Sequence, residues 1–521
     1  MSPHPWPGTA ELLPQLLAWA STRRWFPLRS GPAPQAASTR VVVDVELAPG
    51  IHDLVLALPR AAQDEATGPD EVLLHVPLVV DDVAVLSALT GAREDAQAAG
   101  FVLEGGASAV VDAPHHPAFW QAWARAALAA GSTLSTPAAT AITQRTERLH
   151  VTTGEQSNTS VILPAPLPRP HEGGSAARPD GSAPGGARPA MPPAPQDLDT
   201  GDLIVKLFRV LAPGRNPDVE VSVALARSGW DRVRTPVAWS TLELPGAGTD
   251  GEAVTADSAV ATTFVPQATD GFELFCALAG QDDGEGGTRR RLTTELARDL
   301  GATTARMHEH LASSLGTSEP VSPAELRRDL QERARWALAE VPALQERLPG
   351  LAGHVAQALD AVSSLEHLEP ATRVHGDYHL GQTLHEDQFP GRWYVLDFEG
   401  EPLRPLADRR RPDQPLRDVA GMLRSFDYAA AVGRATDPGW LEAVREAFSS
   451  GYREVLPCAT EPGRHRAQVL LTALELDKAL YEAVYEARHR PAWLEIPVAG
   501  IRQVIGTKSP AKDSARGRVE V

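Results

Sequence analysis

The sequence predicts an α+β fold, with a strand-rich first part followed by a helical second part. Short apolar runs suited to strands recur up to residue 267 of the 521 residues, whereas apolar residues at helical spacing dominate from Arg291 onward. A chain of this length exceeds one simple core. We therefore expect a subdomain at residues 1–105, the rest of a strand-rich lobe at 106–267, a helical lobe at 268–507 and a flexible tail at 508–521.

The first part is expected to begin with a helix and to continue as an antiparallel sheet. Apolar residues recur at helical spacing in Ala10–Ala20 and again in Phe119–Ala130. Val83–Leu89 suits either a helix or a strand. The expected strands are Arg40–Leu47, Leu54–Leu58, Val72–Val79, Arg148–Val151, Ser160–Leu163 and Leu203–Phe208.

Pro164–Gln196 separates two of these strands. It is rich in Pro, Gly, Ala and Ser and has almost no large apolar residues. Such a segment cannot bury enough surface to offset the entropy of ordering it. We expect a disordered insertion at residues 164–196, because strand-like sequence resumes at Leu203.

The second part is expected to be mostly helical, with a catalytic loop between its helices. The expected helices are Leu292–Ala312, Pro323–Val341, Ala343–Leu365, Pro415–Val432, Pro438–Tyr452 and Arg464–Arg488.

Composition limits the compartment and the partners. The net charge of −18 disfavours nucleic acid and anionic membranes. The two cysteines form no paired motif, no apolar stretch is long enough to cross a bilayer, and the first residues lack a secretory pattern. We expect a cytoplasmic protein that binds neither nucleic acid nor membrane.

The most informative stretch is a His-Gly-Asp loop followed by a strand that ends in an aspartate. Gln382 follows Asp377 with the spacing of the Asp and Asn in the protein-kinase catalytic loop. Asp397 ends the apolar run Trp393–Leu396 and precedes a Phe, as in the kinase Asp-Phe-Gly element. A lone His-Gly-Asp triplet would be an ordinary hydrogen-bonded loop, but the pair of signals indicates phosphoryl transfer.

Phosphoryl transfer needs positioning and electrostatics more than covalent help. We assign Asp377 as the catalytic base that takes the proton of the attacking hydroxyl. Mg²⁺ prefers oxygen ligands, and we assign Asp397 and Gln382 to it. The nearby run Arg409–Arg411 is either a solvated loop or a source of one Arg that braces the site.

Nucleotide-binding residues are expected in the first part, with ATP as the cofactor. Lys206 lies inside an apolar strand, where a lysine is costly unless it is paired. We expect it to hold the nucleotide phosphates with Glu220 as its partner; alone, it would be read as an edge-strand lysine that reaches solvent. A phosphate-binding turn is expected at Ser157, Asn158, Thr159 and Ser160, and an adenine-contacting hinge at Phe264, Val265 and Gln267.

The sequence resembles the maltokinases, bacterial members of the aminoglycoside-phosphotransferase-like kinase superfamily. The resemblance rests on Gln156–Ser160, Lys206–Arg209, Pro213–Glu220, Val374–Gln382, Asp397–Pro402, Pro415–Ala430 and Lys478–Ile496, and on Arg24–Trp25–Phe26 near the start. It implies a bilobal eukaryotic-like kinase fold, with an N-terminal cap subdomain on the strand-rich lobe and a helical second lobe. It also implies ATP-dependent phosphorylation of maltose at the anomeric hydroxyl, for α-glucan synthesis, with trehalose synthase as a possible partner.

The sugar is expected to lie against the later helices. We assign its binding to His375, Tyr481, Glu482, Tyr485, Arg424 and Asp427. Tyr481 and Tyr485 share a helix face, although each also suits helix packing. Arg424 and Asp418 suit equally well a brace for the catalytic loop.

Two alternatives stay open. One is a kinase for another sugar or amino sugar, such as glucosamine or an aminoglycoside. The other is a catalytically weak scaffold that partners trehalose synthase, against which the intact set of Lys206, Glu220, Asp377, Gln382 and Asp397 argues.

Overall fold

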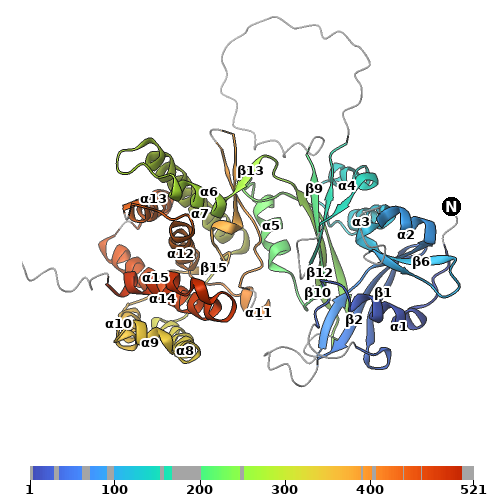
Figure 1. The fold of residues 1–521 in the computed structure, drawn as a ribbon, viewed down its shortest axis with the longest axis horizontal. Coiled ribbons are helices and arrows are strands. Elements are labelled where there is room, and N and C mark those ends of the chain that lie inside the picture. Colours follow the sequence, from blue (N-terminus) through green and yellow to red (C-terminus); the bar gives the residue numbers. More distant parts are fainter. Residues whose placement is uncertain are drawn as a thin grey trace, which may run out of the picture. The chain divides into compact units, whose positions relative to one another are not determined.

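The computed structural model describes residues 4–28, 34–60, 71–90, 99–152, 158–166, 201–246, 251–388, 391–401, 406–437, 439–458 and 460–506. The chain divides into two compact units (Figure 1), one of Met1–Gly229 and Arg234–Pro266 and one of Trp230–Val233 and Gln267–Val521. The expected insertion, from residue 167 onward, and the expected tail lie outside the described residues.

The first unit opens with α1 (Thr9–Ala20) and a seven-stranded antiparallel sheet in the order β10-β3-β2-β4-β6-β5, with β1 also paired to β2. Leucines of α1 pack in one buried cluster with leucines of β2. Because β5 and β6 are neighbours on either side of residue 105, this sheet extends beyond the expected subdomain boundary. Its strands are β1 (Arg40–Ala48), β2 (Ile51–Pro59), β3 (Glu71–His75), β4 (Leu78–Asp82), β5 (Gly100–Val102), β6 (Ser108–Asp112) and β10 (Val210–Leu211).

A five-stranded antiparallel sheet follows, in the order β11-β12-β9-β8-β7. Strands β8 and β9 pair from Asn158↔Phe208 to Leu163↔Leu203, so the two strands expected on either side of the insertion are confirmed and are neighbours in the sheet. The strands are β7 (His150–Val151), β8 (Asn158–Leu163), β9 (Leu203–Phe208), β11 (Pro236–Leu244) and β12 (Val254–Thr263).

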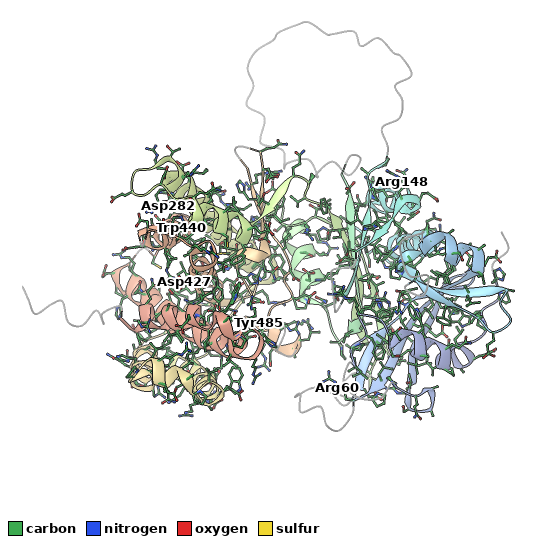
Figure 2. All side chains as sticks on the ribbon, in the orientation of Figure 1. Arg60, Arg148, Asp282, Asp427, Trp440 and Tyr485 are labelled. Carbon is green, nitrogen blue, oxygen red and sulfur yellow. The ribbon has the colours of Figure 1, made fainter. Side chains whose placement is uncertain are left out.

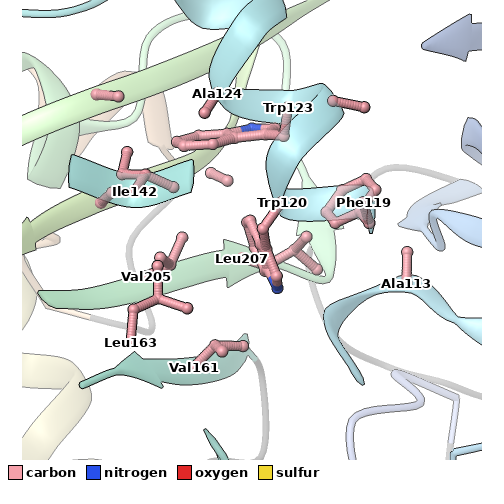
Figure 3. Packing of buried hydrophobic residues seen from close by; sticks show 14 of the residues in the cluster. Ala113, Phe119, Trp120, Trp123, Ala124, Ile142, Val161, Leu163, Val205 and Leu207 are labelled. Atoms are coloured by element: carbon pink, nitrogen blue, oxygen red, sulfur yellow. The ribbon is translucent and has the colours of Figure 1, made fainter. Parts of the chain in front are cut away.

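Helices of the first unit cover these sheets. Trp120 and Trp123 of α3 pack with Val205 and Leu207 of β9 in one buried cluster (Figure 3). Burying these large aromatic surfaces is a main source of stability for the unit. Besides α1, the helices described in the first unit are α2 (Val83–Thr90), α3 (Pro117–Ala129), α4 (Thr136–Thr143) and α5 (Pro217–Arg227).

The second unit is mainly helical (Figure 1). The segment Ala343–Leu365, expected as one helix, forms two, because Gly350 adopts a left-handed backbone with φ 80° between them. The helices are α6 (Gly271–Gly280), α7 (Thr288–Leu315), α8 (Pro323–Glu340), α9 (Ala343–Arg347), α10 (Leu351–Ser363), α11 (Leu406–Arg409), α12 (Leu416–Val432), α13 (Gly439–Val455), α14 (Glu461–His489) and α15 (Glu495–Gly506).

Two small antiparallel sheets complete this unit. One has the order β13-β16-β17, with β13 (Ala268–Asp270), β16 (Thr383–Glu386) and β17 (Trp393–Val395); the other pairs β14 (Thr317–Ser318) with β15 (Ala371–Thr372). No helix in the described ranges is both long and apolar enough to cross a membrane.

Helices α7 and α13 approach closely through glycines. A Cβ added to Gly301 of α7 would lie 2.0 Å from the Phe448 carbonyl oxygen, and one added to Gly451 of α13 would lie 1.9 Å from the Arg298 carbonyl oxygen. The two helix backbones can therefore approach this closely only because Gly301 and Gly451 both lack a Cβ atom.

We expect Gly451→Ala to lower the free energy of unfolding by about 1–3 kcal/mol, because the methyl group would force the two helices apart. The matched control is Gly353→Ala on α10, where an added Cβ meets nothing within 4 Å. The control should be neutral or slightly stabilising. Urea unfolding followed by circular dichroism measures both, and equal stability of the two variants would show that α7 and α13 do not need this contact.

Candidate active site

The loop that carries Asp377 is held by a buried carboxylate on α12. Asp418 accepts hydrogen bonds from the backbone N–H of His375 at 2.8 Å and of Gly376 at 2.9 Å. Its side chain also meets His308 Nε2 of α7 at 3.0 Å. Gly376 has a φ of 84°, which favours glycine, so the turn depends on both its residue type and this anchor.

Asp418 is ionised in this setting. Burial alone would raise the pKa of Asp418, but the hydrogen bond and charge of His308, with the Gly376 N–H, hold it below its ordinary value. The loop is therefore fixed by a negative charge that lies beneath it.

His375 lies behind the loop and not on a pocket wall, which corrects the expectation of a sugar contact. It is 1% exposed, and its Nε2 donates to the Leu396 carbonyl oxygen at 2.7 Å. Its ring also packs 4.9 Å from that of Phe398. The side chain thus ties the Asp377 loop to the segment that carries Asp397.

Asp377 is paired with a half-buried lysine of α14. Lys478 Nζ donates to Asp377 Oδ1 at 3.1 Å and to Glu401 Oε1 at 3.3 Å. Burial alone would lower the pKa of Lys478, but the carboxylates of Asp377, Glu401 and Glu482 raise it, so the ammonium stays charged. Lys478 was not assigned a role from the sequence; the available signal was a lysine three residues before Tyr481, on the same helical segment.

Asp397 and Gln382 come together at the end of β17. Asp397 has a left-handed backbone, with a φ of 58°, and its Oδ2 lies 3.5 Å from the Gln382 amide nitrogen. Since the two ends of an amide are assigned from hydrogen bonding, rotation would present the Gln382 carbonyl oxygen instead. A carboxylate and an amide oxygen this close fit a divalent cation such as Mg²⁺.

One arginine of the Arg409–Arg411 run braces this segment. Arg409 Nη1 donates to the Glu399 carbonyl oxygen at 3.3 Å. Of the two interpretations of the run, the geometry favours the brace for Arg409.

In the first unit, Lys206 of β9 pairs with a carboxylate of α5, as expected for a phosphate-holding lysine. The partner is Asp218, whose Oδ2 lies 3.2 Å from Lys206 Nζ. Glu220, the expected partner, lies on the same helix. Both acidic residues lie in the first turn of α5, where a negative charge also suits the helix dipole.

The expected phosphate-binding turn is placed differently. Asn158, Thr159 and Ser160 lie in strand β8, since they pair with β9, and Ser157 lies outside the described residues. Thr159 and Ser160 are buried, and the Thr159 hydroxyl accepts from Arg209 Nε at 2.8 Å. The Thr159 hydroxyl is thus engaged within the fold, and the assignment of this segment to phosphate stays a prediction.

The expected hinge residues fall at the change from one unit to the other. Phe264 and Val265 follow β12, and Val265 is buried. Gln267 begins the second unit, with a φ of 49°, and its side chain accepts from Gln388 Nε2 at 3.1 Å. Their contact with adenine stays a prediction.

A pocket of about 660 Å³ in the second unit has Asp377 and Lys478 on its wall. Tyr481, Glu482 and Tyr485 line it from α14, and Figure 2 labels Tyr485 on this helix; their contact with a sugar stays a prediction. The other lining residues, which come from α6, the loop, α12 and the end of α14, are Asp270, Phe272, Glu273, His379, Gly381, Gly421, Ser425, Tyr428, Glu486, Arg490 and Trp493.

Arg424 and Asp427 lie behind this wall, which corrects their assignment as sugar contacts. Arg424 is 0% exposed; its Nε and Nη2 donate to Glu482 Oε2 at 3.0 and 2.8 Å, and its Nη1 pairs with Asp427. A buried guanidinium must be paired in this way. Gly500 of α15 leaves room for it, since a Cβ there would lie 1.7 Å from Arg424 Nη1.

Arg445 extends this chain of charges to Glu475. It donates to Asp427 Oδ1 at 3.1 Å and to Glu475 Oε2 at 2.6 Å. Burial raises the pKa of Glu482 above its ordinary value, and Arg424 and Lys478 oppose the rise. The orientation of Glu482 toward the pocket is therefore set by residues that no ligand needs to touch.

The fold is that of the protein-kinase-like phosphotransferases, which confirms the expected α+β, bilobal class. Residues 250–458 match the model of the phosphotransferase enzyme family. A solved glucosamine kinase in complex with glucosamine, ADP and inorganic phosphate is similar over 96% of this chain and 99% of its own, with a TM-score of 0.60 at 23% identity. A second crystal form of a glucosamine kinase gives a TM-score of 0.61 at 22% identity. At these identities the similarity establishes the fold.

Two curated relatives are named glucosamine kinases. The one from Streptacidiphilus jiangxiensis is 33% identical over 308 residues, which is 55% of this chain and 64% of that protein. The one from Mycolicibacterium smegmatis is 29% identical over 315 residues, 57% of this chain and 74% of that protein. The first alignment thus spans less than two thirds of its relative.

We expect Asp418→Asn to lower the free energy of unfolding by about 3 kcal/mol, because the amide would leave buried donors of the loop and His308 without acceptors. The lowered pKa gives the pH dependence: the stabilisation is complete above about pH 4, the ordinary value for aspartate, and is lost as the pH falls through the lower folded-state value. Urea unfolding at several pH values measures the difference from wild type.

The matched control is Asp360→Asn on α10, where the Asp360 side chain is 63% exposed. It should change stability little at any pH. A difference between Asp418→Asn and wild type that grows as the solution is acidified would contradict the assignment of an ionised anchor.

Proposed function

We propose that this protein is an ATP-dependent sugar kinase in which Asp377 is the catalytic base. The observation that carries the proposal is the position of Asp377 on the wall of a pocket lined by carboxylates and aromatic side chains, with the Asp397–Gln382 pair on the segment tied to the same loop. A pocket of about 660 Å³ is in the range of small-molecule sites.

In this mechanism a sugar hydroxyl donates its hydrogen bond to Asp377, which takes the proton as the oxygen attacks the γ-phosphorus of ATP. Lys478 holds the Asp377 carboxylate in position through the 3.1 Å contact. Asp397 and Gln382 would hold Mg²⁺, which neutralises charge on the phosphates. Lys206, steadied by Asp218, would contribute an ammonium to the nucleotide.

An amino sugar of the glucosamine class is the first candidate for the substrate. The names of the curated relatives support it, and so does the charge of the pocket. Its lining has more carboxylates than cations, and a positively charged substrate fits that balance. The carboxylates are Asp270, Glu273, Asp377, Glu482 and Glu486; the Lys and Arg side chains are Lys478 and Arg490.

Maltose is the second candidate. The resemblance to maltokinases favours it, and aromatic side chains line the pocket. Tyr481, Tyr485 and Trp493 offer ring faces of the kind that pack against the C–H surfaces of sugars.

A coupled ADP-release assay with Mg-ATP against glucosamine, maltose and glucose tests the proposal, with the product position determined by phosphorus NMR. We expect turnover with at least one of these sugars. The preferred sugar decides between the two candidates. Nucleotide binding without turnover on any sugar would contradict the proposal and favour a scaffold.

We expect Asp377→Asn to lower kcat by about 10²–10⁴-fold, because the amide cannot take the proton. Nucleotide affinity, measured by calorimetric titration, should stay close to that of wild type. Asp387→Asn, on the exposed turn after β16, is the matched control and should keep full activity. An unchanged kcat in Asp377→Asn would remove this residue from the mechanism.

A further inference from the structure

One carboxylate oxygen in the pocket wall has no protein partner. Glu486 lies one helical turn beyond Glu482 on α14 and is 1% exposed. Its Oε1 accepts from the Tyr428 hydroxyl at 3.1 Å and from Arg490 Nη2 at 2.8 Å. Its Oε2 is buried, and in the described part of the chain no donor lies within hydrogen-bonding distance of it.

A buried carboxylate oxygen is costly to leave unpaired. Buried polar atoms without partners are few in native proteins, so each of them points to strain, an unseen water or a ligand. Glu486 lines the same pocket as Asp377, where a bound molecule can supply the missing donor.

The neighbouring cation is already engaged. Arg490 is bound to Oε1, and its guanidinium lies 4.5 Å from the centre of the Trp493 ring and 5.5 Å from that of Tyr485. Arg490 thus bonds to Oε1 while packing against two rings, and Oε2 keeps its capacity to accept.

We propose that Glu486 is a specificity-determining residue whose Oε2 binds the positively charged amino group of the substrate. The proposal rests on the proposed sugar-kinase function and narrows its substrate class to amino sugars. An ammonium group satisfies both the geometry and the charge of this oxygen, because a hydrogen bond to an ionised partner is roughly twice as strong as a neutral one. A sugar hydroxyl would satisfy the geometry alone.

The test compares glucosamine with glucose, which carries a hydroxyl where glucosamine carries the amine. Glu486→Gln keeps the shape and an acceptor oxygen but removes the charge. We expect the ratio of kcat/KM for glucosamine to kcat/KM for glucose to fall by about 10–100-fold, the size of one charge-assisted hydrogen bond. Glu461→Gln, in the exposed first turn of the same helix, is the matched control and should leave the ratio unchanged.

A titration of the wild-type protein gives a second test that does not depend on the folding of a variant. Glucosamine should bind more tightly than glucose at neutral pH, and this preference should disappear as the pH rises above the pKa of the amine. An unchanged specificity ratio in Glu486→Gln, or equal binding of the two sugars by the wild type, would overturn the role of Glu486. If the wild type phosphorylates none of the tested sugars, the proposed function itself fails. That outcome can be told apart from the two results that overturn only the role of Glu486.

Discussion

The geometry of the site depends on one buried negative charge. Asp418 binds two consecutive backbone N–H groups of the catalytic loop and also meets His308 of α7. His308 meets Asp418 through Nε2 and the Tyr452 hydroxyl of α13 through Nδ1, at 3.0 and 2.9 Å. The loop is therefore connected, through Asp418 and His308, to the closely packed pair of helices α7 and α13.

Because of this connection, the glycines of α7 and α13 affect the catalytic-site geometry as well as the packing of the two helices. Tyr452 follows Gly451, the residue that allows the two helices to meet. A wider separation would move the Tyr452 hydroxyl away from His308 and weaken the support beneath Asp418. The position of Asp377 thus depends on the contact between the backbones of α7 and α13. The second unit must be well packed for the loop to be held in place.

Local patterns in the sequence predicted much of the fold. Strands β8 and β9 followed from apolar runs on either side of a Pro- and Gly-rich insertion, and the long helices followed from their apolar spacing. The loop of Asp377 and the strand that ends at Asp397 were predictable because each motif is contiguous. What each residue contacts was harder to predict, since Asp418 lies 43 residues beyond its loop partner His375, and Lys478 lies 101 residues beyond Asp377.

Burial was the other property that the sequence did not reveal. Arg424 and His375 are polar residue types that suit a sugar site, yet both are enclosed by the fold. Thr159 and Ser160 suit a phosphate turn, yet the strand pairing with β9 turns them into core residues. In each case a tertiary partner, invisible in a single sequence, decided whether the side chain faces a ligand or the interior.

The linked charges behind the pocket also limit how its selectivity can be redesigned. Replacing Glu482 with a neutral residue would remove one of the two carboxylates that pair with the buried Arg424 guanidinium. The ion pairs of Asp427 with Arg424 and Arg445 would have to compensate for the lost charge. Glu486 belongs to a smaller hydrogen-bonded cluster with Tyr428 and Arg490. The Arg490 side chain in this cluster is 46% exposed. A change of ligand preference is therefore easier to introduce at this outer turn of α14, where fewer linked charges depend on the exchanged residue.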